Sequence, residues 1–269
     1  MNITFIGGGN MSACIVGGMI QSNWSPNLIT VSDPSLDKLQ QLTTKFKVNT
    51  TSNNIQAIKD ANIVILAVKP QVLKQICQDL KNKINNSTLI VSIVAGITST
   101  TIRKWLDTKA IIVRTMPNTP ALVQEGMTGI FCKEPLSNEQ KNAVQDIFSS
   151  IGKYIWLTQE SELDLVTAIS GSGPAYFFLF FESVIKSAVK LGMDQDTAAL
   201  LVQQTALGSS KMAIKSELSS QKLKTNVMSP GGTTEQAINT LESLDFCDNI
   251  DQAIQAATKR SQEISTLFD

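Results

Sequence analysis

The first twelve residues constrain the fold more than any other part of the chain. Five of the first six residues suit a buried strand, and this segment runs directly into Gly7, Gly8 and Gly9 before a helical pattern begins at Asn10. This order of strand, glycine turn and helix is typical of a dinucleotide-binding turn, in which glycines permit a tight bend and a close approach to a pyrophosphate. The amides at the start of the helix would face the anionic phosphates. The alternative is a glycine-rich turn that binds nothing.

Strand and helix patterns alternate from this turn to residue 158. Residues 63–68 form a continuous apolar run, as expected of a strand buried on both faces of a parallel sheet. Ser137 and Gln140 have the spacing of a capping box at the start of a helix. The pattern predicts one α/β domain of the Rossmann type, with a doubly wound sheet, over residues 1–158.

Strand patterns are absent beyond residue 158, and residues 159–269 are predicted to form an all-α domain. Helices are expected over residues 162–169, 174–191, 194–215 and 233–244, with a last one after Asp248. The helix from Ala175 is aromatic and apolar on nearly every side, so it must be buried all round. We expect a partner subunit to cover it; the alternative is a central helix within a monomer.

Composition and charge exclude several classes of protein. The formal net charge is zero, so nothing indicates a nucleic-acid partner. The longest apolar run, residues 175–181, is far shorter than the ~20 residues of a membrane span, and a strand pattern stands where a secretory signal would be. The four cysteines are widely separated, which is typical of a reducing compartment. We expect a cytoplasmic protein that binds no membrane.

The sequence contains no histidine. Histidine-dependent triads and most catalytic zinc sites are therefore excluded, and we expect no metal. A reaction that needs little acid–base help from the protein fits the remaining side chains best.

Asp33 follows Gly9 at about the offset of an acid that binds the adenine ribose in dinucleotide-binding proteins. No arginine stands beside it to receive a 2′-phosphate, and the nearest cation is Lys38. Asp33 by itself therefore favours NADH. The alternative is an Asx turn before Pro34, so this residue leaves the choice of cofactor open.

Two further small-residue turns precede predicted helices, at residues 170–174 and 227–234. Each offers hydroxyl groups and backbone amides at a helix N-terminus, an arrangement suited to a small carboxylate. Plain helix caps are the alternative.

Five motifs together resemble the pyrroline-5-carboxylate reductase family, in the order in which that family carries them. They are Gly7-Gly8-Gly9-Asn10-Met11, Ala67-Val68-Lys69-Pro70, Met116-Pro117-Asn118-Thr119-Pro120, Ser170-Gly171-Ser172-Gly173-Pro174-Ala175-Tyr176 and Ser229-Pro230-Gly231-Gly232-Thr233-Thr234. The resemblance implies the last step of proline biosynthesis, in which NADPH or NADH reduces Δ1-pyrroline-5-carboxylate to L-proline. It also implies a homodimer through the helical domain, and often a decamer of five dimers.

The same resemblance assigns site residues by position. It places Ile6, Gly7, Gly8, Gly9, Asn10 and Met11 around the pyrophosphate, and Ser32, Asp33 and Asn54 near the adenosine. It places Ala67, Val68, Lys69, Pro70, Val94, Ala95 and Asn118 beside the nicotinamide. It assigns substrate binding to Ser229, Gly231, Gly232, Thr233 and Thr234, and it implies that Glu217 faces the substrate. For Lys69 we prefer cofactor contact to a role as an acid.

The chemistry suits a chain without histidine. A cyclic imine can be protonated by solvent, so the protein mainly has to orient two bound reactants. We expect the Thr234 hydroxyl to bind the ring nitrogen and amides near residues 231–233 to hold the carboxylate.

The sequence departs from the family pattern at two positions. NADPH-preferring members usually have small or basic groups where this chain has Asp33, and many members have an acid where it has Thr225. The alternatives are another imine reductase, a β-hydroxyacid-type dehydrogenase, whose catalytic lysine motif is missing here, or a nucleotide-binding dimer without activity, which would not need the turn at residues 229–234.

Overall fold

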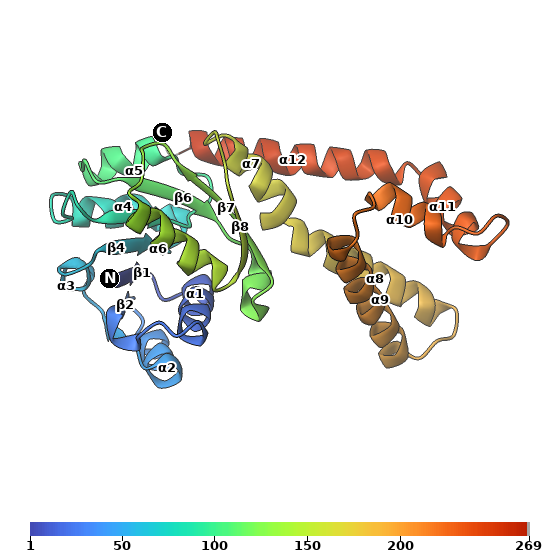
Figure 1. Ribbon diagram of the computed structural model, residues 1–269, viewed down its shortest axis with the longest axis horizontal. Coiled ribbons are helices and arrows are strands. Elements are labelled where there is room, and N and C mark those ends of the chain that lie inside the picture. The colour runs from blue at the N-terminus through green and yellow to red at the C-terminus, as the bar shows by residue number, and fades with distance from the viewer. Residues whose placement is uncertain (268–269) are drawn as a thin grey trace. The chain divides into compact units, whose positions relative to one another are not determined.

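The computed structural model describes residues 1–267, which form two compact units (Figure 1). The first contains Met1–Ser172 together with the segment from Ala256 onward, and the second contains Gly173–Gln255. The domain boundary at residue 158 stays a prediction.

The first unit is built on an eight-stranded sheet with the order β3-β2-β1-β4-β5-β6-β7-β8. The strands are β1 (Ile3–Ile6), β2 (Ile29–Ser32), β3 (Asn49–Thr51), β4 (Ile63–Leu66), β5 (Leu89–Ser92), β6 (Ile112–Met116), β7 (Gly126–Cys132) and β8 (Gly152–Trp156). The first six are parallel, whereas β7 runs antiparallel to β6 and β8 runs parallel to β7. The strand order changes direction between β1 and β4, where ligands of such sheets bind.

Helices cover both faces of this sheet (Figure 1). They are α1 (Asn10–Gln21), α2 (Leu36–Phe46), α3 (Asn54–Ile58), α4 (Pro70–Leu80), α5 (Ser99–Leu106), α6 (Asn138–Ser149) and α7 (Glu162–Val166), with short 3₁₀ turns η1 (Pro26–Leu28) and η2 (Thr119–Val123). Alternate residues of β4 belong to two apolar clusters, Ile63 and Ile65 to one and Val64 and Leu66 to the other. Side chains of a strand alternate between faces, so both faces are buried, and the predicted doubly wound Rossmann fold is confirmed.

The second unit contains α8 (Gly173–Lys190), α9 (Gln195–Lys215), α10 (Ser220–Val227), α11 (Thr233–Ser243) and the beginning of α12 (Phe246–Thr266). Its apolar side chains have little cover within one chain: Phe177, Phe178 and Leu179 are each more than 60% exposed. Exposed apolar patches of this kind mark association surfaces. The single chain therefore does not bury the aromatic helix, as the prediction of a partner subunit requires.

One helical stretch, Glu162–Lys190, is long and apolar enough to cross a membrane by length and composition alone, and 17% of its most apolar window is buried. This stretch is longer than the uninterrupted apolar run of residues 175–181, because it also includes polar and charged residues. Core helices of soluble proteins pass the same test. The stretch is therefore weak support for a membrane span.

One local prediction was wrong, and one helix was not predicted. Residues 170–171 belong to a π-helical segment, η3 (Thr167–Gly171), instead of a turn; Ser172 is a bend whose amide donates to Thr167 O at 2.8 Å, and α8 begins at Gly173. The amides expected to be free there are thus used within the helix. Conversely, α10 was not predicted, because its polar residues lack an apolar period; its start is fixed by the Ser219 side chain, which accepts from the Lys222 amide.

Candidate active site

The glycine turn after β1 takes a backbone shape that only glycine adopts easily. Gly7 has φ +107°, and its amide donates to Ser32 O at 2.7 Å. A Cβ on Gly7 would lie 2.4 Å from Ala67 O. The turn is therefore held tightly between the ends of β2 and β4.

At Gly9, by contrast, an added Cβ would meet no atom of the described residues within 4 Å. Gly9 is the N-cap of α1 with φ −75°, a conformation open to any residue. In the part of the chain that the structure describes, the amides of Asn10, Met11 and Ser12 donate to no protein acceptor. Open space in front of free helix amides fits the pyrophosphate of a dinucleotide.

Asp33 lies just past β2 and is held by the protein itself. Its carboxylate accepts from the Gly8 amide at 2.8 Å and from the Ser35 amide at 2.9 Å, with Lys38 Nζ at 3.5 Å. The bond to Ser35 is the Asx turn that stood as the alternative, and it is confirmed. Asp33 thus fixes the glycine turn to β2, and a role at the adenosine stays a prediction for this residue.

The other predicted cofactor residues lie at the ends of neighbouring strands in the first unit. Ser32 Oγ donates to Asn54 Oδ1 at 2.6 Å, next to Asp33. Lys69 is exposed and caps α4, whose first residue is Pro70. The Ala67 amide is bonded to Ile6 O at 2.9 Å, which sets the strand end beside the glycine turn.

Asn118 is buried, and its side-chain amide is occupied at both ends. Its Nδ2 donates to Ser170 O at 2.9 Å, and its Oδ1 accepts from the Met127 amide at 2.8 Å. The side chain thereby joins the loop after β6 to η3 and β7. Its predicted contact with the nicotinamide is untested.

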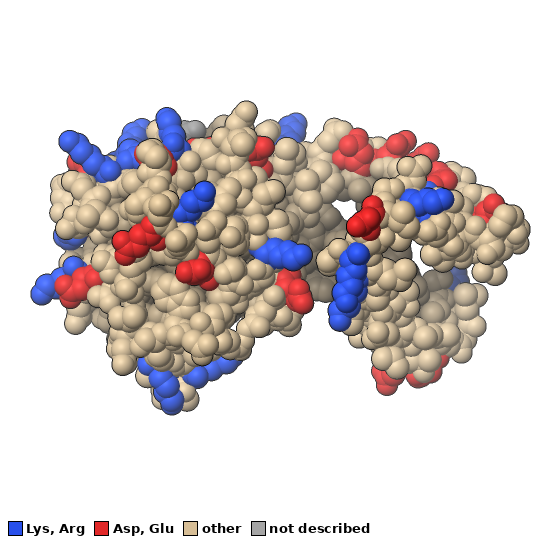
Figure 2. All heavy atoms as spheres, in the orientation of Figure 1, with Lys and Arg blue, Asp and Glu red and all other residues tan. Residues whose placement is uncertain are grey.

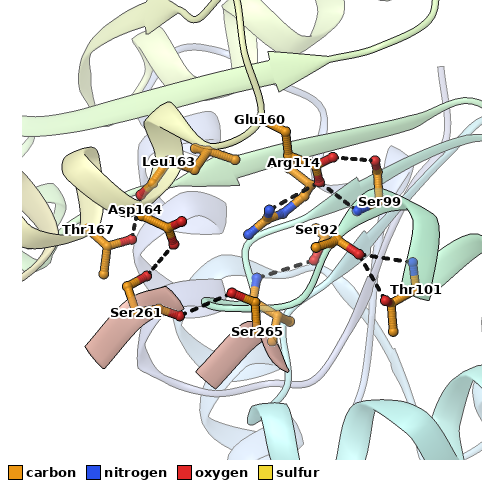
Figure 3. A network of polar contacts seen from close by, with 12 residues as sticks. Ser92, Ser99, Thr101, Arg114, Glu160, Leu163, Asp164, Thr167, Ser261 and Ser265 are labelled. Carbon is orange, nitrogen blue, oxygen red and sulfur yellow. Dashed lines mark hydrogen bonds and ion pairs between the residues drawn. The ribbon is translucent and has the colours of Figure 1, made fainter. Parts of the chain in front are cut away.

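The last turns of α12 pack against the loop that contains Val94 and Ala95. A Cβ on Gly96, which has φ +72°, would lie 2.4 Å from Ile264 Cγ2. Figure 3 shows Ser261 pointing at Asp164 of α7, with Oγ donating to Oδ1 at 2.6 Å. The C-terminal helix therefore helps to fix this strand end.

Glu160 joins three further groups in the same network (Figure 3). Its carboxylate accepts from the Ser99 amide at 2.6 Å and from Ser99 Oγ at 2.9 Å, and it pairs with Arg114 Nη1 at 3.1 Å. Sequence patterns did not single out Glu160 or Arg114. Their positions are far apart in the chain, and only the folded sheet brings them together.

The predicted substrate loop lies between α10 and α11 in the second unit. Gly231 has φ +70°, and its amide donates to Glu235 Oε2 at 2.7 Å, while the Gly232 amide donates to Ser229 O at 2.9 Å. Thr233 begins α11, and Thr234 is half-buried beside it. Glu217 is exposed in the connection from α9 to α10. Glu235 was not predicted, since a glutamate in a first helical turn is common.

An ion pair joins the helices on either side of this loop. Lys224 Nζ of α10 lies 2.7 Å from Glu242 Oε1 of α11, and this hydrogen bond raises the pKa of Lys224. Both side chains are about half exposed, so the pair contributes little to stability.

Three of the four cysteines, Cys14, Cys77 and Cys132, do not supply a nucleophile. Burial raises the pKa of the Cys77 thiol to about 12 and that of Cys132 to about 11. Burial also raises the pKa of Cys14. These thiols stay protonated at neutral pH, and a thiol is a poor nucleophile.

Charges of both signs are dispersed on the face drawn in Figure 2, where most atoms belong to uncharged side chains. That face offers no concentrated basic surface of the kind nucleic acids require.

Comparisons with known proteins cover nearly the whole chain. The family model described as pyrroline-5-carboxylate reductase dimerisation matches residues 160–264, and the one described as NADP oxidoreductase coenzyme F420-dependent matches residues 2–96. The pyrroline-5-carboxylate reductase of Pasteurella multocida is 43% identical, over 99% of this chain and 98% of that protein.

Two solved structures are also similar over most of their length. A pyrroline-5-carboxylate reductase from Coxiella burnetii matches with a TM-score of 0.92 and 44% identity, covering 98% of each chain. The Plasmodium falciparum pyrroline carboxylate reductase, solved with NADP bound, matches with a TM-score of 0.89 and 32% identity, again covering 98% of each chain.

Proposed function

The chain belongs to the pyrroline-5-carboxylate reductase family, and we propose from this premise that it reduces Δ1-pyrroline-5-carboxylate to L-proline with NADPH or NADH, as the last step of proline biosynthesis. The observation that carries the proposal is 43% identity to such a reductase over 99% of the chain. The free helix amides beside Gly9 and the small-residue loop before α11 supply the two binding surfaces that this reaction needs.

The cofactor is assigned to the first unit. The turn at Gly7 and Gly9 and the free amides of α1 would hold its pyrophosphate, and the ends of β4 and β5 would border its nicotinamide. When bound, the reduced nicotinamide supplies a hydride. The chain's own part is to orient the ring and to exclude water.

The substrate is assigned to the loop before α11. Within residues 1–267, the amides of Thr233 and Thr234 have no protein acceptor, so they are free to hold a carboxylate at a helix N-terminus. The Thr234 hydroxyl is assigned to the ring nitrogen. The imine nitrogen takes a proton from solvent, the imine carbon accepts the hydride, and the C=N double bond becomes a single bond.

Coenzyme oxidation with pyrroline-5-carboxylate tests this function. We expect the absorbance of NADPH or NADH to fall on addition of this imine, and to show no change in the reverse direction with a 2- or 3-hydroxyacid and NADP⁺ or NAD⁺. Turnover of the hydroxyacid alone would favour a β-hydroxyacid-type dehydrogenase, and turnover of neither would favour a binding protein.

Asp33 is proposed to lower the preference for NADPH over NADH. Its carboxylate is held at the end of β2, where it would repel the negatively charged 2′-phosphate of NADPH. Replacing Asp33 by Ser should raise the ratio of kcat/KM for NADPH to that for NADH by about tenfold, since like charges in close contact cost several kcal/mol at most and solvent screens part of this.

Asp37→Ser is the matched control, because Asp37 is exposed in the first turn of α2 and, among the described residues, forms no hydrogen bond or ion pair with the glycine turn. Its cofactor ratio should equal that of the wild type. An unchanged ratio in Asp33→Ser would remove this residue from cofactor selection, whatever happens to the absolute rates.

The protein forms homo-oligomers, because residues 160–264 match the dimerisation model. We propose a homodimer through the apolar surface of α8 and α9, with five dimers assembling into a decamer. Sedimentation equilibrium should give about ten times the 29.2 kDa chain mass, or twice that mass if dimers remain separate. A monomeric mass would contradict both assemblies.

We propose a cytoplasmic location because the cysteines form no disulfide in the described residues. Cys14, Cys77, Cys132 and Cys247 are all free in the structure. Reduced thiols are typical of a reducing compartment. Detection of the native protein in a periplasmic or secreted fraction would contradict this assignment.

A further inference from the structure

The loop before α11 is closed by a side chain from the helix that it precedes. Glu235 Oε2 accepts from the Gly231 amide at 2.7 Å, and Gly231 has φ +70°. This left-handed conformation is readily adopted only by glycine, and the carboxylate fixes it with a charge-assisted hydrogen bond.

A second hydrogen bond in the loop occupies the Gly232 amide. The Gly232 amide donates to Ser229 O at 2.9 Å, so the Gly231 and Gly232 amides are both occupied. A Cβ on Gly232 would lie 2.9 Å from Ser229 O, so the turn is also close-packed. In the described part of the chain, the next amides, those of Thr233 and Thr234, are left without an acceptor.

We propose that Glu235 is a positioning residue for the substrate: its carboxylate locks the Gly231 turn, and this lock presents the Thr233 and Thr234 amides to the substrate carboxylate. The inference rests on the proposed function. It also revises the expectation that the Gly231 amide binds substrate, because that amide is already used.

The hydrogen bond of Glu235 indicates a positioning role and not a role in proton transfer. Its Oε2 is bonded to the backbone amide of Gly231, and a loop that must be ordered on binding weakens affinity without slowing the chemical step. Loss of the hydrogen bond between Glu235 and Gly231 should therefore raise KM for pyrroline-5-carboxylate and leave kcat nearly unchanged. A residue in proton transfer would instead act on kcat.

The experiment compares three variants of the intact enzyme at saturating NADPH with pyrroline-5-carboxylate varied. We expect Glu235→Ala to raise KM about tenfold, from loss of one charge-assisted hydrogen bond, with kcat within about twofold of wild type. Glu235→Gln keeps an oxygen acceptor for the Gly231 amide and should stay within about threefold of the wild-type KM.

Glu242→Ala is the matched control. Glu242 lies on the same helix, and its carboxylate pairs with the half-exposed Lys224 instead of the loop. Removing the same charge there should leave KM within about twofold of the wild-type value, because an exposed ion pair contributes little to the stability of the structure. Thermal unfolding of each variant confirms that α11 is intact.

The possible outcomes separate the two proposals. Wild-type enzyme without activity on pyrroline-5-carboxylate contradicts the proposed function itself. Active wild type with an unchanged KM in Glu235→Ala overturns the role of Glu235 alone, as does a parallel fall of kcat in both Glu235 variants. A lower KM in both would show that the carboxylate competes with substrate, which also overturns the lock.

Discussion

Replacement of Thr234 by Ala should lower kcat/KM for pyrroline-5-carboxylate by ~10²-fold or more, as is typical when one positioned donor or acid is removed. Thr234 is the second residue of α11, beside the free amides, and its side chain is half-buried. The hydroxyl is assigned to the ring nitrogen, whose charge changes during hydride transfer. The loss should therefore appear mainly in kcat, in contrast to the effect of Glu235→Ala.

Thr240→Ala is the control for this variant. The Thr240 hydroxyl is exposed on the same helix and donates to Gln236 O at 2.8 Å, so its removal tests only helix stability. Its kinetics should match the wild type, and Thr234→Ser should recover most of the activity. Wild-type kinetics in Thr234→Ala would remove this hydroxyl from the mechanism.

Replacement of Gly9 by Asp should weaken NADPH binding by ~10²-fold or more without destabilising the free protein. The position is the N-cap of α1, its φ of −75° suits any residue, and a new Cβ meets no atom of residues 1–267 within 4 Å. Aspartate is a favoured N-cap residue and complements the helix dipole, so stability should be equal or higher. The same carboxylate would occupy the space of the pyrophosphate and repel it, at a cost of several kcal/mol.

The dissociation constant of NADPH and the melting temperature, measured on the same samples, check this prediction. Ser137→Asp is the control, because it places the same charge at the exposed N-cap of α6 in the same unit. It should leave the dissociation constant unchanged. Unaltered NADPH binding in Gly9→Asp would place the pyrophosphate elsewhere.

The strands of the first unit were predictable because burial on both faces leaves a plain signal. Residues 63–68 read as one apolar run, and β4 covers Ile63–Leu66 with every residue buried. The capping box of Ser137 and Gln140 is likewise present as predicted. Both signals are local, so neighbouring residues suffice to identify them.

The prediction at residues 170–174 was wrong because small residues occur both in turns and where helices pack closely. Glycine and serine there suggested a turn, yet a Cβ on Gly171 would lie 2.8 Å from Met116 Cε. The glycine is therefore needed for close packing of the π-helical segment against Met116. Sequence shows that the residue is small without showing which neighbour requires it.

The site was predictable in its outline and not in its contacts. The glycine turn and the loop before α11 were found from their residue types, whereas the bonds of Glu160 and Glu235 depend on where the folded chain brings a carboxylate. Asp33 shows the same limit: the sequence left an Asx turn and a ribose contact open, and the structure shows the turn.

Transfer of a label from the coenzyme tests the central claim most directly. With NADPH deuterated at the transferable position of C4 of the nicotinamide and unlabelled pyrroline-5-carboxylate, the enzyme should form L-proline with one deuterium on the former imine carbon. Proline without that deuterium, or oxidation of the coenzyme without formation of proline, would contradict direct hydride transfer to the cyclic imine.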